Sequence, residues 1–415
     1  MKNVADIYAL SPMQELMLFH AKTTEHTDDV LFNQIVYEIK GGLDTDAYRR
    51  AWQLMVDRHS ALRTLFVWQD GKDPLQVVRE QVALPWAEHD WRELSATEQE
   101  QELDQLLAAD RAKGFDLLQA PLMRINLVRL DDRDYWLVWS SHHLIIDRWC
   151  IGILFGELKD AYEAYNASAL PPLAPAPRYS DYIAWLARQD KIELHAYWNA
   201  VLRDTQARPL ALRSATEDVS AVVDSVEIML EGDDWAKLRQ FALDKNLTPS
   251  TLIIATWALI LGTATGVDDS ILGLTVSGRP AGLARVEQTV GCFINNVPLR
   301  VALDRDRPLT AWLQEVQENQ LSLKSYEYAS IAQIQSWSGL KTKGPLFDTL
   351  LVLQSPVQVA EPADLTVRFY RGGMQTGYPI SLGAIPAKDS LRLVLSYDQQ
   401  RVPEELIEQM VSSLQ

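Results

Sequence analysis

The chain has 415 residues, more than the roughly 250–300 that a single hydrophobic core usually serves, so we expect two lobes. A formal net charge of −17 argues against nucleic acid as a partner, because nucleic-acid-binding proteins carry basic patches. The two cysteines, Cys150 and Cys292, cannot build a disulfide framework. This cysteine usage favours an intracellular, cytoplasmic protein.

The apolar segments of the chain do not predict a membrane protein. The N-terminal residues MKNVADIYAL lack the basic and apolar regions of a signal peptide. The longest apolar run, residues 251–262, is shorter than the roughly 20 residues that span a bilayer, so we expect a buried helix there and no membrane partner.

Hydrophobic periodicity predicts helices alternating with strands over the first 170 residues. The predicted helices cover residues 12–21, 44–58 and 95–113, and the predicted strands cover residues 31–40, 62–68 and 75–79. Residues 122–130 alternate between apolar and polar side chains, with Arg124 and Asn126 on the polar face. This pattern is typical of a half-buried strand.

The most informative stretch of the first lobe is SSHHLIIDRW, residues 140–149. Before it, DYWLVW (residues 134–139) predicts a strand buried on both faces. After it, apolar residues recur at three- and four-residue steps from Ile151, which predicts an amphipathic helix. His142 and His143 thus lie where a buried strand ends, and Asp147 lies where a helix begins.

Three interpretations of this HHxxxD pattern remain open from the residues alone. Asp147 can be a helix N-cap beside two interior histidines. A metal site is disfavoured, because a catalytic zinc takes three protein ligands and no third ligand occurs at a recognisable spacing. One histidine can also act as an acid or base while the other residues hold the local structure.

A proline-rich segment, residues 171–178, predicts an extended connector between the lobes. We therefore expect a first lobe over residues 1–170 and a second over residues 179–415. In the second lobe, helices are predicted at residues 179–202, 233–245, 250–262, 309–324 and 403–414. Strands are predicted at residues 220–230, 270–276, 293–303, 347–354, 365–370, 378–384 and 391–397.

The HHxxxD stretch resembles the signature of the condensation domains of nonribosomal peptide synthetases, which are relatives of chloramphenicol acetyltransferase. Other stretches are similar to further motifs of this family and occur in family order: LSPMQ (10–14), RHSALRTLF (58–66), YSDYIAW (179–185), VGCFINN (290–296) and GPLFD (344–348). The resemblance covers nearly the whole chain. It departs from the family at Arg148, where glycine is usual, and at Asn296, where threonine is usual.

The resemblance implies an α/β (α+β) fold of two acetyltransferase-like lobes, arranged as a V-shaped pseudo-dimer with a central tunnel. It also implies an acyltransferase that forms an amide bond between a donor thioester and an aminoacyl acceptor, each bound to a carrier protein. No GxSxG elbow occurs. We therefore expect direct transfer without an acyl-enzyme intermediate.

In this family His143 would be the catalytic residue, and His142 and Asp147 would support the site structurally. Arg63 would be the ion-pair partner of Asp147, with Arg124 as the second choice. Candidates for contact with the tunnel or the substrate are Arg148, Trp149, Ser277, Asn295 and Tyr378. For Trp149, as for Trp185 and Trp337, we favour a place in the core, and for Arg148 we favour a side chain that reaches solvent.

The resemblance also implies the partners. The substrates would arrive on the 4′-phosphopantetheine of donor and acceptor peptidyl carrier proteins, beside an adenylation domain. No cofactor or metal would be bound by the domain itself, which we expect to be monomeric when excised. The alternatives are an epimerisation domain, which shares HHxxxD, and a catalytically silent platform that binds carrier proteins or tailoring enzymes.

Overall fold

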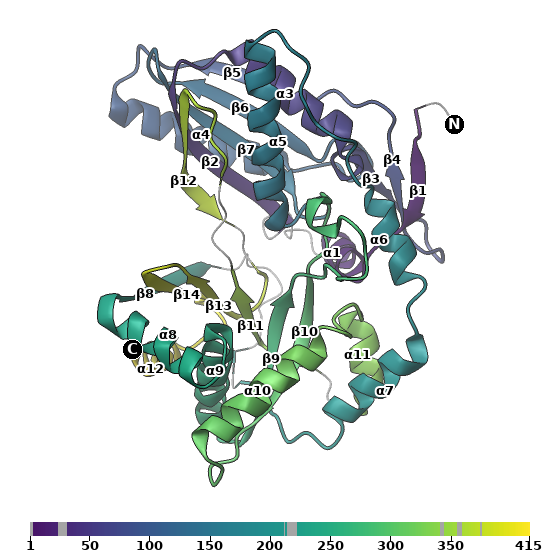
Figure 1. The fold of residues 1–415 in the computed structure, drawn as a ribbon, viewed down its shortest axis with the longest axis vertical. Coiled ribbons are helices and arrows are strands. Elements are labelled where there is room, and N and C mark those ends of the chain that lie inside the picture. Colours follow the sequence, from purple (N-terminus) through teal and green to yellow (C-terminus); the bar gives the residue numbers. More distant parts are fainter. Residues whose placement is uncertain are drawn as a thin grey trace. The chain divides into compact units, whose positions relative to one another are not determined.

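A computed structural model describes residues 3–23, 31–210, 212–213, 222–340, 344–354, 359–373 and 376–415. The chain divides into two compact units, each with its own central sheet (Figure 1). The first unit comprises residues 1–189, 279–293 and 357–375; the second comprises 190–278, 294–356 and 376–415. Two units were expected, but the boundaries differ, because two later segments of the chain pack with the first unit.

The central sheet of the first unit has five strands in the order β12-β2-β7-β6-β5. Their bounds are Leu365–Gly373 (β12), Phe32–Gly41 (β2), Asp134–His142 (β7), Met123–Arg129 (β6) and Trp86–Asp90 (β5). All neighbours are antiparallel except β5 and β6, which are parallel. The strand that ends at His142 is therefore the middle strand.

Helices cover both faces of this sheet. On one face lie α3 (Thr45–Arg58) and α5 (Trp149–Asn166) (Figure 1). Trp52 of α3 and Phe155 of α5 pack there against Trp139 of β7. On the other face, Leu103 of α4 (Ala96–Lys113) packs with Trp136 and other apolar residues of the sheet. The prediction that residues 134–139 form a strand buried on both faces is confirmed, because every residue from Tyr135 to His142 is buried.

The prediction that residues 122–130 form a half-buried strand is wrong in its exposure. In β6, Arg124 and Asn126 are only 7% and 9% exposed. The guanidinium of Arg124 is paired with the Asp110 carboxylate of α4 and donates to the Gly114 carbonyl at 2.7 Å. An ion pair supplied by a covering helix thus lets a polar strand face lie in the interior.

A small three-stranded sheet, in the order β1-β4-β3, completes the first unit together with α1 (Pro12–Thr23) and α6 (Tyr179–Leu186). Its strands are Asp6–Ala9 (β1), Leu75–Val78 (β4) and Thr64–Val67 (β3). The predicted strand at 62–68 starts later, because Ser60–Arg63 form a 3-10 turn. The predicted helix 179–202 is broken: Asp190 caps a separate helix, α7 (Lys191–Leu202), in the second unit.

The second unit has a six-stranded sheet in the order β10-β9-β11-β13-β14-β8. The strands are Asn295–Ala302 (β10), Asp269–Val276 (β9), Thr349–Leu353 (β11), Ile380–Pro386 (β13), Ser390–Asp398 (β14) and Val223–Glu231 (β8). The helices are α7, α8 (Gly232–Asp244), α9 (Pro249–Thr265), α10 (Leu309–Leu323), α11 (Ile331–Trp337) and α12 (Glu404–Leu414).

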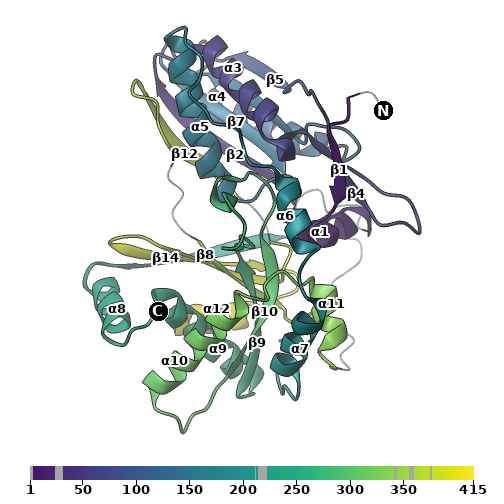
Figure 2. The same cartoon turned by 45° about the vertical axis from the view of Figure 1, so that its right-hand side comes forward.

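The helix predicted to be buried is α9, which packs with its neighbours α8, α10 and α12 (Figure 2). It carries the fully buried Ile254 and Trp257. Thr248 is its N-cap. Among the described residues, no single helix is long and apolar enough to cross a membrane, although the bent pair α8 and α9 together passes that test by length and composition.

Candidate functional site

The two histidines lie where β7 runs into a tight turn before α5. The His142 N–H donates to the Leu122 carbonyl at 2.9 Å, and the His143 N–H donates to the Leu31 carbonyl at 2.8 Å. The Ile145 N–H then returns to the His142 carbonyl at 3.2 Å and closes the turn. Backbone hydrogen bonds to neighbouring segments of the chain therefore fix the backbone positions of both histidines.

His142 is a buried, neutral residue that holds the turn. Its Nδ1 accepts a hydrogen bond from the Leu144 N–H at 3.1 Å. A nitrogen that accepts carries no proton, so the proton of the neutral ring is on Nε2. Burial, with a smaller contribution from His143, lowers the pKa of His142 to about 3. This environment suits a structural group and not one that exchanges protons near neutral pH.

His143 has the opposite arrangement. Its Nδ1 lies 2.8 Å from the Ile146 carbonyl oxygen, which can only accept, so Nδ1 carries the proton and Nε2 carries the lone pair. Burial lowers the pKa of His143, and this effect outweighs the opposing influences of the Ile146 carbonyl and the Asp147 charge. The residue remains 7% exposed. His143 is therefore held as a neutral base whose Nε2 can accept a proton.

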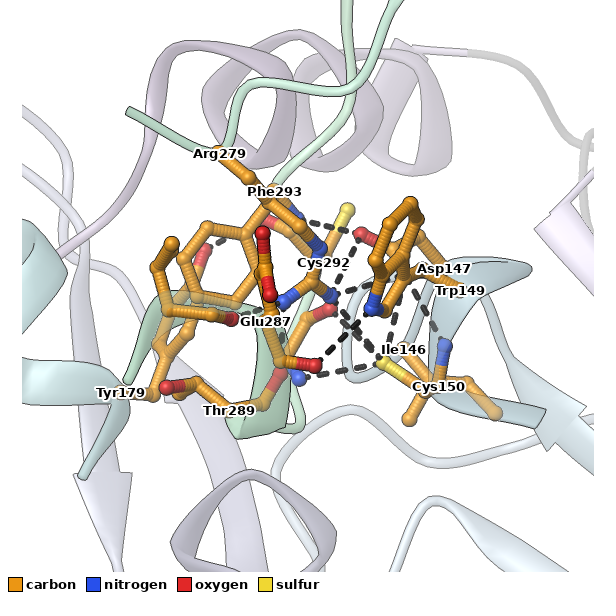
Figure 3. Close-up of polar contacts among 12 residues, drawn as sticks. Ile146, Asp147, Trp149, Cys150, Tyr179, Arg279, Glu287, Thr289, Cys292 and Phe293 are labelled. Atoms are coloured by element: carbon orange, nitrogen blue, oxygen red, sulfur yellow. Dashed lines mark hydrogen bonds and ion pairs between the residues drawn. The ribbon is translucent and has the colours of Figure 1, made fainter. Parts of the chain in front are cut away.

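Asp147 fastens the start of α5 to the segment 279–293 of the same unit (Figure 3). One carboxylate oxygen accepts from the Phe293 N–H at 3.0 Å, and the other accepts from the Cys150 N–H at 3.3 Å. The Cys150 Sγ lies 3.3 Å from the same oxygen. Asp147 lies one residue before the N-cap position of α5, which is Arg148, so the contact with the Cys150 N–H is only part of what its carboxylate binds.

The cation that faces Asp147 is Arg279. Its Nη2 lies 3.3 Å from Oδ1, and the two side chains are only 4% and 1% exposed. Its Nη1 donates to the carbonyls of Val286 at 2.5 Å and Thr289 at 2.8 Å, and its guanidinium lies 4.1 Å from the centre of the Phe293 ring. This buried ion pair has the additional hydrogen bonds that a charge needs away from water.

The predicted ion pair between Arg63 and Asp147 is wrong, and so is the second choice, Arg124. Arg63 donates to the backbone carbonyls of Val56 at 3.1 Å and Glu80 at 3.1 Å, and Arg124 pairs with Asp110. Arg279 was missed, although it belongs to the SGRP loop (277–280) that includes the candidate Ser277. An arginine beside a glycine and a proline after a buried strand was the available signal.

Two further predictions near the turn need correction. Trp149 is not a core residue: its side chain is 48% exposed, and its Nε1–H donates to the Glu287 carbonyl at 3.0 Å. Trp185 and Trp337 are half-buried. Arg148 does not simply reach solvent, because it is half-buried and burial lowers its pKa, with a smaller opposing influence from Tyr37. Its Nε is buried and has no hydrogen-bond partner among the described residues.

The remaining candidates lie in the second unit. Ser277 is exposed and directly follows β9. The last residue of β9, Val276, pairs with Asn295, the first residue of β10. The Asn295 amide donates to the carbonyls of Glu327 at 2.8 Å and Ala329 at 2.7 Å, so it holds a loop in place. Burial raises the pKa of Tyr378 to about 12, and its ring stacks on Phe347 at 5.5 Å.

Two other polar groups of the second unit lie near these candidates, Asn296, which the sequence marked as a departure from the family, and Glu327, which it did not mark. Asn296, at the threonine position of the family motif, accepts a hydrogen bond from the Thr275 hydroxyl at 2.9 Å. Glu327 accepts from the Gly278 N–H at 3.1 Å, and burial raises its pKa to about 7. Over the described residues, no group of three or more histidines, cysteines, aspartates or glutamates could hold a metal ion.

Comparisons with known proteins place the chain in a family. The family model "Condensation domain" matches residues 4–415. A linear gramicidin synthase of Brevibacillus parabrevis is 34% identical over 430 residues, and bacitracin synthase 3 of Bacillus licheniformis is 32% identical over 419 residues. These matches cover 100% and 97% of this chain, but only 8% and 6% of those much longer proteins.

Solved structures show the same fold. The X-domain from teicoplanin biosynthesis matches with a TM-score of 0.83 at 19% identity, covering 97% of this chain and 92% of that one. The first condensation domain of the calcium-dependent antibiotic synthetase matches with a TM-score of 0.80 at 18% identity, covering 99% and 96%. The fold is thus the mixed α/β fold of these domains, and the chain belongs to the condensation-domain family.

Proposed function

We propose that this chain forms an amide bond between an acyl or peptidyl thioester and the amine of an aminoacyl thioester. One observation carries the proposal: the Nδ1–H of His143 is bound to the Ile146 carbonyl, which leaves Nε2 as a proton acceptor. An α-amine with a pKa of about 7.7–8.0 is a suitable partner for such a base.

In the proposed reaction, the amine nitrogen attacks the thioester carbonyl carbon and a C–N bond forms. The proton that leaves the nitrogen passes to His143 Nε2, the C–S bond breaks, and the thiolate released takes up a proton. A thioester and an amine already react with each other, so holding them together can supply roughly 7–11 kcal/mol of the barrier reduction. The base then needs only to accept the proton of the attacking amine nitrogen.

We propose that this transfer is direct, without an acyl-enzyme. A covalent route would need an activated nucleophile close to the base. The nearby thiols, Cys150 and Cys292, are both buried, and burial raises the pKa of each far above its usual range. A thiol that stays protonated is a poor nucleophile.

We propose that both substrates arrive on the 4′-phosphopantetheine of peptidyl carrier proteins, and that an adenylation domain is a neighbour in a longer synthetase. Two facts support this proposal. The named relatives are peptide synthases of which this chain matches only a small part. A four-domain nonribosomal peptide synthetase also matches in fold, with a TM-score of 0.77 at 19% identity, and the match covers 32% of that chain.

The test loads one carrier protein with an acyl or peptidyl donor and a second with an aminoacyl acceptor, adds the chain, and measures the joined thioester by intact-protein mass spectrometry. We expect the product only when both carriers are loaded. Incubation of the peptidyl carrier alone in deuterated water tests for epimerisation through exchange at the α-carbon. Deuterium uptake without a joined product would favour an epimerisation domain, and neither signal would favour a silent binding platform.

A further inference from the structure

Two buried glutamines of the first unit form a reciprocal amide pair next to the turn of residues 143–146, which carries His143. Gln14 lies in α1 and Gln76 in β4, and each side chain is only 1% exposed. The Gln14 Nε2 donates to Gln76 Oε1 at 3.1 Å, and the Gln76 Nε2 donates to Gln14 Oε1 at 2.8 Å. The Gln76 Nε2 also donates to the Ala9 carbonyl at 2.9 Å.

The Gln14 amide also reaches the residue that follows His143. Its Nε2 donates to the Leu144 carbonyl at 2.8 Å, and its Oε1 accepts from the Ser11 N–H at 2.9 Å. A backbone N–H can only donate and a carbonyl can only accept, so these two partners fix the orientation of the amide. Each of its four hydrogen-bonding positions is therefore occupied.

The hydrogen bond from Gln14 to the Leu144 carbonyl attaches the turn of residues 143–146 to a further segment of the chain. The segments at Leu31 and Leu122 hold the backbone N–H groups of His143 and His142, and Gln14 holds the Leu144 carbonyl. The contact brings in an element far along the chain, because Gln14 and Leu144 are 130 positions apart. Within the turn itself, the His143 Nδ1 is bound to the Ile146 carbonyl, so a shift at Leu144 would move the acceptor that sets the tautomer of His143.

We propose that Gln14, oriented by Gln76, is a positioning residue for His143: it holds the 143–146 turn so that Nδ1 keeps its proton and Nε2 stays free to accept one. The kinetic consequence rests on the proposed amide-forming function, but the tautomer of His143 does not. The competing interpretation is that Gln14 only caps α1 through Ser11.

Three variants separate these interpretations. Gln14→Met keeps the length of the side chain but removes all of its hydrogen bonds. Gln14→Glu keeps the acceptor for the Ser11 N–H, and therefore the cap, but an ionised carboxylate cannot donate to the Leu144 carbonyl. Gln53→Met is the matched control, because Gln53 also binds backbone, at Val82 and Leu84, but lies away from the turn.

Two readouts are needed. Nitrogen-15 NMR of histidine-labelled protein distinguishes an Nδ1–H from an Nε2–H ring, and the signals of His143 are identified by their loss in His143→Ala. Kinetics with two loaded carrier proteins give kcat and KM separately. The NMR readout uses no substrate, so it decides on the positioning role even if the parent protein forms no amide.

We expect Gln14→Met to show a new Nε2–H population at His143 and a kcat lowered roughly 10- to 100-fold with KM unchanged, the effect of a misplaced catalytic group. Gln14→Glu should lose kcat as rising pH ionises the carboxyl, whereas Gln53→Met should behave as the parent in both readouts. Unchanged His143 signals in a folded Gln14→Met protein, or the same changes in Gln53→Met, would overturn the proposal. If Gln14→Met does not fold, Gln14→Glu decides, and failure of both to fold would make Gln14 a purely structural residue.

Discussion

At the residue scale, two adjacent histidines of one motif have opposite hydrogen-bonding roles. The Nδ1 of His142 accepts from a backbone N–H, whereas the Nδ1 of His143 donates to a backbone carbonyl. The ring partners therefore select different neutral tautomers, and only His143 presents an Nε2 lone pair. The family resemblance implies a catalytic His143 and a structural His142, and these hydrogen bonds support that proposal.

Replacing His143 by alanine should abolish amide formation and leave the fold intact, because His143 is the proposed base and, among the described residues, its ring is bound to the Ile146 carbonyl within its own turn. The measurement is product formation by mass spectrometry, with a thermal melt as the check on folding. His142→Asn is the matched control, since its Oδ1 can accept from the Leu144 N–H in place of Nδ1. Near-normal turnover by a folded His143→Ala protein would remove His143 from the mechanism and leave proximity as the source of rate.

The buried histidines should make the protein less stable in mild acid. The pKa of His142 is about 3 in the folded protein but about 6.5 in an unfolded chain, so between these values the unfolded chain binds more protons. The free energy of unfolding should therefore fall as the pH drops below about 6.5. His142→Asn, which cannot titrate, should flatten this dependence in urea unfolding measured at several pH values. A slope equal to that of the parent would show that other groups cause the acid sensitivity.

The ion pair between Asp147 and Arg279 should be strongly coupled. Asp147→Asn or Arg279→Met leaves a buried charge without its partner, which typically costs roughly 3–5 kcal/mol of stability. The double variant should lose much less than the sum of the two. Arg63→Met is the control, because Arg63 binds backbone carbonyls and should combine additively with Asp147→Asn. Urea unfolding of all five variants gives the coupling energies, and additive losses for Asp147 and Arg279 would exclude the pairing.

The sequence contains the SGRP loop but does not connect its Arg279 with Asp147. The family resemblance implies Arg63 as the partner, but this side chain donates to the backbone carbonyls of Val56 and Glu80 instead. Arg279 is 132 positions from Asp147, and no local pattern connects the two. Chemistry indicated that a buried aspartate needs a cation, but only the packed structure indicates which one.

At the scale of elements, Gly291 is a place where the fold has no room for a side chain. A Cβ at this position would lie 2.1 Å from the Tyr179 ring, and the Tyr179 hydroxyl donates to the Cys292 carbonyl at 2.5 Å. The ring of α6 is therefore held against the backbone of the segment that supplies the Phe293 N–H to Asp147. Close packing of this kind requires glycine for space and not for an unusual backbone conformation.

Gly291→Ala should therefore destabilise the protein by roughly 1–3 kcal/mol, the usual cost of overpacking. It should also lower activity by displacing the Phe293 N–H, which donates to Asp147. Gly282→Ala in the same segment is the matched control, since its Cβ would meet only the Trp185 Nε1 at 3.8 Å, an ordinary contact. Chemical unfolding compares the two. Equal stabilities for both variants would mean that the Tyr179 ring can move aside at little cost.

The long elements of the chain were predicted well and the short ones poorly. Periodicity located α3 and α5 to within a few residues, because each buries an apolar stripe, and the polar helix expected at residues 95–113 is α4. It did not indicate β5, whose sequence WAEHD is mostly exposed at an edge of the sheet. Such a strand exists because β6 offers it a pairing partner. Periodicity also predicted that the polar face of β6 is exposed. This face is buried, because the covering helix α4 supplies Asp110 to Arg124.

At the scale of the whole molecule, the order of the chain does not follow the order of the units. The proline-rich segment suggested that everything after residue 178 forms the second lobe. Instead, β12 pairs with β2 although more than 300 positions separate them, and the segment 279–293 carries both Arg279 and Phe293 to Asp147. No pattern within a short window can predict that a later segment returns to an earlier unit.

This topology predicts that the first unit cannot fold as a simple N-terminal fragment. Residues 1–189 contain β2 and Asp147 but lack β12, Arg279 and the Phe293 N–H. An unpaired buried carboxylate costs roughly 3–5 kcal/mol, which is comparable to the 5–15 kcal/mol of net stability of a typical protein. We expect the fragment to show no cooperative thermal transition by circular dichroism, whereas the full chain does.

A second comparison isolates the contribution of the missing partner. In the full chain, Asp147→Asn breaks an ion pair and should destabilise. If the fragment retains a cooperative transition against this expectation, the same substitution removes a buried charge that has no cation, so it should leave stability unchanged or raise it. The sign of the effect therefore reverses between the two proteins, which a general loss of packing would not produce. A fragment that melts cooperatively and is destabilised by Asp147→Asn would show that residues 1–189 contain another partner for the carboxylate, and that the later segments are not needed to complete the site.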